Sequence, residues 1–255
     1  HSSTNIARQA AICAGLPVTV AGMSLDRQCA SGMMAIATAA KQIMHDGMDI
    51  VIGGGVESIS MVQTPEMRVG SDKWLKDNKP EMYMTMLETA ENVATRFNIS
   101  REVQDAYAAQ SQERTHAAQQ AGKLDDEVVA MSTTMMIQNK ETKELTSHEV
   151  TIEKDEGNRP GTSAESLAGL KPVFKDGLNL QTGEFITAGN ASQLSDGASA
   201  SIVMEASLAE KKGLEPLGRY VGVMAAGCEP DEMGIGPIYA VPKLLEAHGL
   251  KMDDI

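Results

Sequence analysis

Hydrophobic positions near the N-terminus follow the order strand, helix, strand. Residues 23–28 begin with a short apolar stretch, which predicts a strand. In residues 30–45 apolar side chains surround nearly the whole helical circumference, which predicts a buried helix that ends at Gly47. Residues 49–53 form a continuous apolar run, typical of a strand in a sheet covered on both faces. Two strands joined through a helix by short links predict a parallel βαβ unit.

Capping residues and glycines delimit further helices. Ser3 or Thr4 can cap a first helix that stops at Gly15, and Ser100 can cap a long helix that Gly122 ends. Towards the C-terminus the pattern predicts a strand at 198–204, a helix at 209–212, a strand at 219–225 and a helix at 237–249. The chain is therefore expected to have an α/β fold. Between about residues 61 and 192 the pattern is irregular, and an insertion of that kind is usually functional.

Cys29 stands where the predicted strand gives way to the predicted helix. Unpaired N–H groups and the positive end of the helix dipole favour a thiolate there, and the thiolate is the nucleophilic form. Ala30, Ser31 and Gly32 are small and leave the approach open to a bulky substrate. The alternative role for a single cysteine is a buried structural one. Cys29 is thus a candidate nucleophile whose assignment depends on the motifs around it.

The composition narrows the classes of partner. With 255 residues, 42% of them apolar, the chain can bury a substantial core and form more than one domain. The net charge of −13 argues against nucleic acid and against an anionic membrane surface, because no cluster of Lys and Arg can neutralise phosphates. The three cysteines form no CxxC pair, which indicates free thiols in a reducing compartment. With no visible signal peptide or membrane-spanning run, we expect a cytoplasmic protein without membrane insertion.

Several sequence blocks, in this order, resemble those of the thiolases. They are residues 26–33 (DRQCASGM), 53–60 (GGGVESIS), 88–94 (ETAENVA), 100–105, 170–174 (LKPVF), 187–192 (TAGNAS), 196–198 and 233–237 (MGIGP). The resemblance implies a thiolase-like layered αβαβα fold, incomplete, with an inserted loop domain. It assigns residues 1–61 and 195–216 to the N-terminal, nucleophile-bearing half without its first strand. Residues 62–194 become the loop domain that covers coenzyme A, and residues 217–255 the start of the C-terminal half.

The resemblance also implies roles for individual residues. Cys29 is the nucleophile, Arg159 lies against the nucleotide end of coenzyme A, and Ser166 and Ser192 contact coenzyme A. The pantetheine channel and acyl pocket are lined by Ala188, Gly189, Phe174, Met86 and Met233. For Phe174 and the two methionines, ordinary core packing is the alternative. Four residues depart from the family pattern: Asp26, Thr85, Gln193 and Ser195. Thr85 stands where many thiolases have a histidine.

The family's base is not matched in this sequence. The histidine of the family's Gly-His-Pro motif and the cysteine of its Cys-x-Gly-Gly-Gly motif have no counterpart here. None of the five histidines of this chain takes the place of the missing histidine. The glycine run at Gly53 is no phosphate loop, because no Lys-Ser/Thr follows it. We therefore expect a chain truncated at both ends, which by itself is inactive.

The reaction implied is thiolysis of a 3-oxoacyl-CoA, or the reverse Claisen condensation of acetyl-CoA, through an acyl-cysteine intermediate. Coenzyme A is then a substrate, and neither a cofactor nor a metal is implied. A homodimer or homotetramer is expected. Two alternatives stay open at this point: a non-catalytic thiolase-like binder of coenzyme A or lipid, and a ketoacyl synthase, against which the long loop domain argues.

Overall fold

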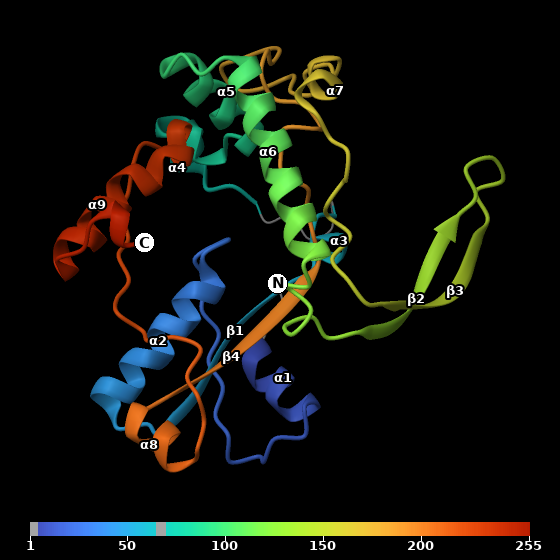
Figure 1. Cartoon of the computed structure of the whole chain (residues 1–255). Coiled ribbons are helices and arrows are strands. Elements are labelled where there is room, and N and C mark those ends of the chain that lie inside the picture. The colour runs from blue at the N-terminus through green and yellow to red at the C-terminus, as the bar shows by residue number, and fades with distance from the viewer. Residues whose placement is uncertain (1–4, 65–69) are drawn as a thin grey trace. The chain divides into compact units, whose positions relative to one another are not determined.

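The computed structural model describes residues 5–64 and 70–255 (Figure 1). Backbone contacts divide the chain into two compact units. The first unit consists of His1–Lys73, Leu194–Glu229 and Ile235–Ile255. The second consists of Trp74–Gln193 and Pro230–Gly234. The three domain ranges assigned from the family resemblance stay a prediction.

The first helix of the first unit, α1, spans Ile6–Cys13. Its N-cap is Asn5, whose side-chain oxygen accepts the N–H of Arg8 at 3.1 Å. The predicted caps Ser3 and Thr4 lie outside the described residues. Gly15 follows the helix with a φ of 78°, a left-handed conformation that glycine adopts without steric cost. The predicted stop of this helix is confirmed.

The central elements of the first unit are helix α2 (Ser31–Asp46) and strand β1 (Ile50–Glu57). Both elements were predicted from the hydrophobic pattern, and the left-handed C-cap of α2 is Gly47. The predicted burial is not observed, because α2 buries only three alanine side chains and Ile50 and Ile52 of β1 are exposed. The strand predicted at 23–28 does not form. Its last residues are folded into a turn, in which Ala30 N–H donates to Arg27 O at 3.0 Å. Local hydrogen bonding there has replaced strand pairing.

Strand β1 pairs with β4 (Gly197–Met204), from Ile50 opposite Met204 to Glu57 opposite Gly197. The pairing is antiparallel. The predicted parallel βαβ unit is wrong because its first strand, at 23–28, does not form. At one end of the pair, Asp196 accepts the N–H of Ser60 at 3.0 Å, and this bond lowers the pKa of the Asp196 carboxyl. Ser60 belongs to the short helix α3 (Ile59–Val62). The partner of β1 thus comes from a distant part of the sequence.

The glycine run in β1 permits close backbone packing on both sides. A Cβ at Gly53 would lie 2.8 Å from Ile36 Cα, and one at Gly55 would lie 3.2 Å from Gly32 Cα, both in α2. A Cβ at Gly54 would lie 2.5 Å from Ser199 O in β4. The run therefore fixes α2 against the sheet.

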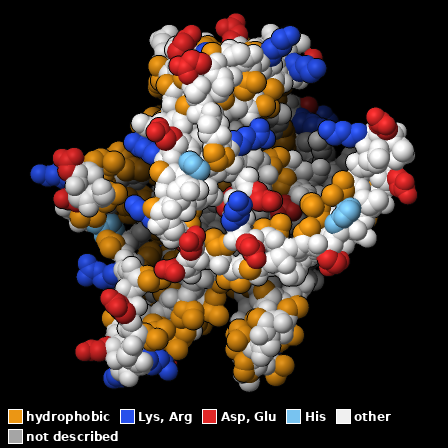
Figure 2. Space-filling model, turned by 45° about the vertical axis from the view of Figure 1, so that its right-hand side comes forward, with side chains coloured by type: hydrophobic (Ala, Val, Ile, Leu, Met, Phe, Trp, Pro, Cys, Tyr) orange, Lys and Arg blue, Asp and Glu red, His pale blue; other side chains and the backbone are white. Residues whose placement is uncertain are grey.

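The rest of the first unit is helical or irregular. It contains α8 (Ala206–Lys211) and α9 (Gly236–His248), which confirm the predicted helices, and the 3₁₀ turn η4 (Met252–Asp254). The predicted strand at 219–225 does not form, since none of the described strands pairs with it. Large hydrophobic side chains stay exposed on β1 and β4, including Ile52 and Ile202, and Figure 2 shows hydrophobic side chains at the surface. The buried core of α2 is made of alanines.

The second unit contains four α-helices, a 3₁₀ turn and a hairpin among its described residues. They are α4 (Lys73–Asn78), η2 (Pro80–Tyr83), α5 (Met86–Arg96), α6 (Arg101–Gln120), α7 (Ala164–Ala168), and strands β2 (Met131–Gln138) and β3 (Leu145–Ile152); α4 begins at the boundary residue Lys73. The 3₁₀ segment η3 (Pro230–Ile235) also falls largely within this unit. Ser100 caps α6 and Gly122 follows it with a φ of 66°, as predicted. Helices α6 and α7 pack together.

Residues 172–187 form an irregular hairpin in the second unit. Isolated bridges join Pro172 to Thr187 and Lys175 to Thr182. Val173 N–H donates to Ile186 O at 2.9 Å, and Gly177 N–H donates to Leu180 O at 2.9 Å. This hairpin connects the two sequence blocks that the family resemblance places around the substrate.

Candidate functional site

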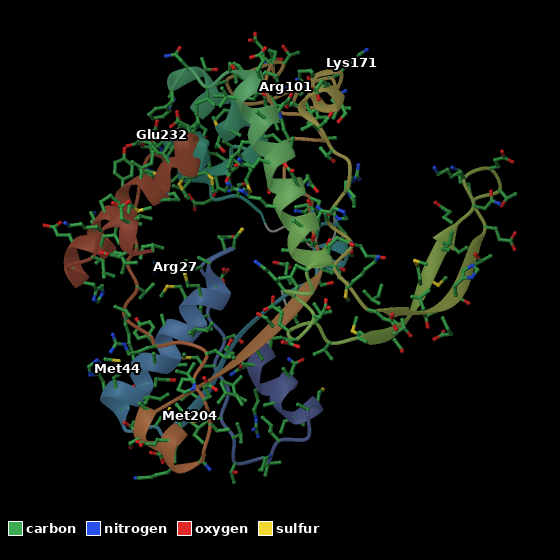
Figure 3. All side chains as sticks on the ribbon, in the orientation of Figure 1. Arg27, Met44, Arg101, Lys171, Met204 and Glu232 are labelled. Carbon is green, nitrogen blue, oxygen red and sulfur yellow. The ribbon has the colours of Figure 1, made fainter. Side chains whose placement is uncertain are left out.

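Cys29 lies in a tight turn directly before α2, and its side chain is exposed. The preceding Gln28 has a φ of 49°, which is unusual for a residue other than glycine. Two side chains stabilise the turn. Asp26 Oδ1 accepts the N–H of Gln28 at 2.7 Å, and Ser31 Oγ accepts the N–H of Arg27 at 2.8 Å while donating to Gln28 O. Arg27, two residues before Cys29 in this turn, is labelled in Figure 3. Asp26, a departure from the family pattern, thus has a structural contact here.

Cys29 stands directly before the N-terminus of α2. The first turn of this helix holds no acidic residue, and no side chain caps it. The first N–H groups of a helix have no partner within it, so the N-terminus of α2 next to Cys29 is the positive end of the helix dipole. Cys13, by contrast, is the last residue of α1, at the negative end of that helix.

Met86 and Met233, both assigned to the acyl pocket, line one cavity of about 320 Å³ in the second unit. Most of the lining is apolar. The lining residues are Met86, Thr89, Ala90, Val93, Ala94, Ile99, Gln104, Ile186, Met233 and Gly234. A cavity of this size and character suits a small apolar group.

Contacts to α5 hold the segment that carries Met233. Arg96 forms ion pairs with Asp231 and with Glu232, the latter at 2.9 Å (Figure 3). The pair with Arg96 lowers the pKa of the Asp231 carboxyl, and the two acidic partners raise the pKa of Arg96. Asn92 Nδ2 donates to Asp231 O at 3.0 Å. These bonds fix Met233 opposite α5.

Two buried glutamates of α5, which sequence reasoning left without a role, organise the 172–187 hairpin. Glu88 and Glu91 are 1% and 2% exposed. The Glu88 carboxylate accepts the N–H groups of residues 178, 179 and 180 at 2.8, 2.6 and 3.1 Å. The Glu91 carboxylate accepts those of residues 184, 185 and 186 at 3.0, 3.1 and 2.8 Å. The signal in the sequence was an acidic pair three residues apart in a helix, which places both carboxylates on one face.

A second polar network connects α6 to residues 187–190. Arg101 pairs with the buried Asp105 at 2.7 Å and donates to Leu167 O, also at 2.7 Å (Figure 3). Asp105 in turn accepts Asn190 Nδ2 at 3.0 Å. The fully buried Thr187 accepts the N–H groups of Gly189 and Asn190 at 3.3 Å. The network fixes the backbone at Ala188 and Gly189.

Several of the predicted coenzyme A contacts lie near α7. Gly189 packs tightly there, because a Cβ on it would lie 2.4 Å from Leu167 Cδ2. The Ser166 hydroxyl takes part in the capping box of α7, donating to Ser163 O at 2.8 Å. Ala188 is exposed. The roles predicted for these residues are not tested by their placement and stay predictions.

The remaining predicted residues differ in exposure. Arg159 is exposed, and its N–H donates to Gln112 Oε1 at 2.8 Å. Ser192 is exposed, whereas Phe174 is 5% exposed and does not line the described cavity. Thr85 caps α5, with its Oγ1 accepting the N–H of Glu88 at 3.3 Å. Core packing is thus the observed environment of Phe174.

The predicted residues belong to different units. Cys29 lies in the first, while the eight predicted substrate contacts lie in the second. In the described part of the chain, no group of three His, Cys, Asp or Glu side chains is arranged to hold a metal ion. None of the described helices is both long and apolar enough to cross a membrane.

Family models and relatives match nearly the whole chain. Residues 1–207 match the thiolase N-terminal domain and residues 214–255 the thiolase C-terminal domain. The chain is 43% identical over 251 residues to a peroxisomal 3-ketoacyl-CoA thiolase of Yarrowia lipolytica, covering 97% of this chain and 58% of that protein. It is 39% identical over 252 residues to a 3-ketoacyl-CoA thiolase of Bacillus subtilis, covering 98% of this chain and 62% of that protein. The chain therefore spans about three fifths of these relatives.

Solved structures show the same fold. The dimeric peroxisomal thiolase of Saccharomyces cerevisiae superimposes with a TM-score of 0.81 at 35% identity, covering 97% of this chain and 60% of that one. The acetyl-CoA acetyltransferase of Bacillus anthracis superimposes with a TM-score of 0.77 at 38% identity, covering 98% and 62%. The predicted α/β thiolase fold is confirmed. From the sequence blocks, the family models and these structures together, the chain belongs to the thiolase family.

Proposed function

We propose that the complete protein is an acyl-CoA C-acyltransferase that cleaves 3-oxoacyl-CoA with coenzyme A, or runs the reverse condensation. The observation that carries this proposal is the exposed Cys29 at the uncapped N-terminus of α2. The names of the relatives, 3-ketoacyl-CoA thiolase and acetyl-CoA acetyltransferase, support the same class of reaction.

In the proposed reaction, Cys29 Sγ attacks the 3-keto carbon as a thiolate. The bond between carbons 2 and 3 then breaks, acetyl-CoA leaves after its carbon 2 takes up a proton, and an acyl thioester stays on Cys29. The thiol of a second coenzyme A attacks that thioester, loses its proton and regenerates the Cys29 thiolate. The Cys29 N–H would donate to the oxyanion, a contact worth up to about 3 kcal/mol. No residue of this sequence is assigned to the proton transfers.

The second unit would bind the substrate. Met86 and Met233 would contact the acyl group through the cavity that they share. Ala188, Gly189, Ser166 and Ser192 would contact coenzyme A, whereas the buried Phe174 would support the pantetheine channel by packing behind it. The exposed Arg159 would bind the nucleotide end, where a guanidinium can stack on the base and pair with phosphate. Coenzyme A is a substrate in this proposal.

Assembly and location are part of the same proposal. The similar structure from Saccharomyces cerevisiae is described as dimeric, which supports a homodimer here. Relatives of this chain include a protein described as peroxisomal and a bacterial one, so the cytoplasmic location stays a prediction.

Trapping the acyl-enzyme tests the proposed function. The protein from the complete reading frame is incubated with a 3-oxoacyl-CoA, quenched in acid and mapped by mass spectrometry. We expect the acyl group on the Cys29 peptide, with Cys13 and Cys228 as internal controls. Acylation spread equally over the three cysteines would contradict the proposal. Tight coenzyme A binding without any acylation would instead favour the non-catalytic binder. The 255-residue chain, assayed in parallel, is expected to show no turnover.

A further inference from the structure

The two buried glutamates of α5 hold different parts of the same hairpin. Both are nearly inaccessible to solvent, and each accepts three successive backbone N–H groups. The backbone approaches both carboxylates closely. A Cβ at Gly177 would lie 2.7 Å from Glu88 Oε2, and one at Gly183 would lie 2.5 Å from Glu91 Oε1. The two clamps are therefore alike in chemistry and in tightness.

The Glu88 and Glu91 clamps differ in which part of the hairpin they position. Glu91 accepts the N–H of Ile186 at 2.8 Å, and Ile186 lines the cavity shared by Met86 and Met233. Residues 178–180, which Glu88 holds, do not line that cavity. Helix α5 itself supplies another wall, including Val93 and Ala94. Glu91 thus sets the spacing between two walls of one apolar cavity.

We infer that Glu91 is a positioning residue that fixes the width of an acyl-chain cavity between α5 and Ile186. This inference rests on the proposed function, because it takes the ligand to be the alkyl tail of an acyl-CoA. The cavity of about 320 Å³ has room for roughly ten groups the size of a water molecule, at about 30 Å³ each. A medium-length alkyl chain would fill it, whereas an acetoacetyl group would occupy only a small part.

The variant Glu91→Gln removes the clamp with the least change of shape. Its side chain keeps one oxygen but presents an NH₂ donor to N–H groups that are themselves donors. At least one buried N–H then loses its acceptor, which is unfavourable, and the segment 184–186 moves away from α5. Substrates that fill the cavity lose contact with the displaced wall. Short substrates lose little.

The matched control is Glu88→Gln, which makes the same chemical change on the same helix face but releases only residues 178–180. The complete protein and both variants are assayed with acetoacetyl-CoA and with 3-oxooctanoyl-CoA, and their melting temperatures are recorded. We expect Glu91→Gln to lower the ratio of kcat/KM for the longer to the shorter substrate about tenfold, the scale of one lost buried hydrogen bond. The loss should appear mainly in KM. For Glu88→Gln the ratio should stay within about twofold.

An equal change of this ratio in the two variants, or no change in either, overturns the inference while leaving the proposed function intact. Absence of turnover in the unmodified protein contradicts the proposed function instead. In that case the two glutamine substitutions are each combined with Cys29→Ser, and the affinities for octanoyl-CoA and acetyl-CoA are measured by calorimetry. The inference then requires Glu91→Gln, but not Glu88→Gln, to lower the ratio of the two affinities. If Glu91→Gln does not fold, Gly183→Ala replaces it, because its methyl group would lie 2.5 Å from Glu91 Oε1. Gly183→Ala should then shift the ratio, while Glu88→Gln stays the control.

Discussion

The two units hold their predicted functional residues by different means. In the first unit, α2 is fixed by backbone contact with a glycine-rich strand, and its buried side chains are alanines. The turn that holds Cys29 is stabilised by the side chains of Asp26 and Ser31. In the second unit, buried carboxylates of α5 and α6 accept backbone or side-chain N–H groups from the 172–190 segment. Packing of small residues in the first unit leaves Cys29 exposed next to a helix N-terminus. Buried polar networks give a loop region one defined conformation, because every lost partner leaves a costly unpaired group.

The largest effect is expected at the nucleophile. Cys29→Ser keeps the small side chain and the turn but replaces the thiolate with a much weaker nucleophile. Turnover in the complete protein should fall by roughly three orders of magnitude or more, the scale seen when a catalytic nucleophile is removed. Coenzyme A binding, measured by calorimetry, should stay within a few fold. Cys13→Ser is the control, and an equal loss in that variant would refute the special role of α2's N-terminus.

The next largest effect tests the polar network of the second unit. Asp105→Ala leaves Arg101, which is 17% exposed, without its ion-pair partner and removes the acceptor of Asn190. Breaking such a buried pair should lower the free energy of unfolding by about 3–5 kcal/mol. Chemical denaturation measures this loss, with the exposed Arg114→Ala on the same helix as control. A loss below about 1 kcal/mol would show that the network is dispensable.

A smaller effect is expected where the first unit depends on glycine. In Gly53→Ala the new methyl group would lie 2.8 Å from Ile36 Cα, a backbone atom that cannot move without shifting α2. Overpacking of this kind should cost about 1–3 kcal/mol. Gly218→Ala is the control, because no atom lies within 4 Å of the position that its methyl group would take. Equal melting temperatures for the two variants would argue against tight packing between β1 and α2.

The smallest effect concerns pH and the ion pair between Arg96 and Asp231. The pair lowers the pKa of Asp231 in the folded state, so its stabilisation is fully present above the ordinary carboxyl pKa of about 3.9 and is lost progressively as the pH falls from there through the lowered pKa. Arg96 is 43% exposed, so the pair contributes at most about 1 kcal/mol. Asp231→Asn should therefore lower the melting temperature slightly at pH 7 and by a smaller amount at pH 3. A constant difference across that range would assign the effect to something other than the ion pair.

The sequence by itself determined the features that depend on neighbours along the chain. The Ser100 cap of α6 and the glycines that end α1, α2 and α9 act within a few residues, so residue type and spacing are sufficient to predict them. The ordered sequence blocks likewise identified the family, and the position of Cys29 before α2 followed from the change of hydrophobic pattern.

Only the tertiary structure decided features that join distant segments. The partner of β1 is β4, and the pairing is antiparallel, which no local pattern specifies. Glu88 and Glu91 find their N–H donors 90 to 95 residues away, so sequence spacing shows two acidic side chains but not what they bind. The predicted strand at 23–28 fails for the related reason that local bonds form a turn before Cys29 and no described strand pairs with it. Strand pairing and buried polar contacts depend on which segments folding brings together, whereas helix caps depend on the chain within one turn.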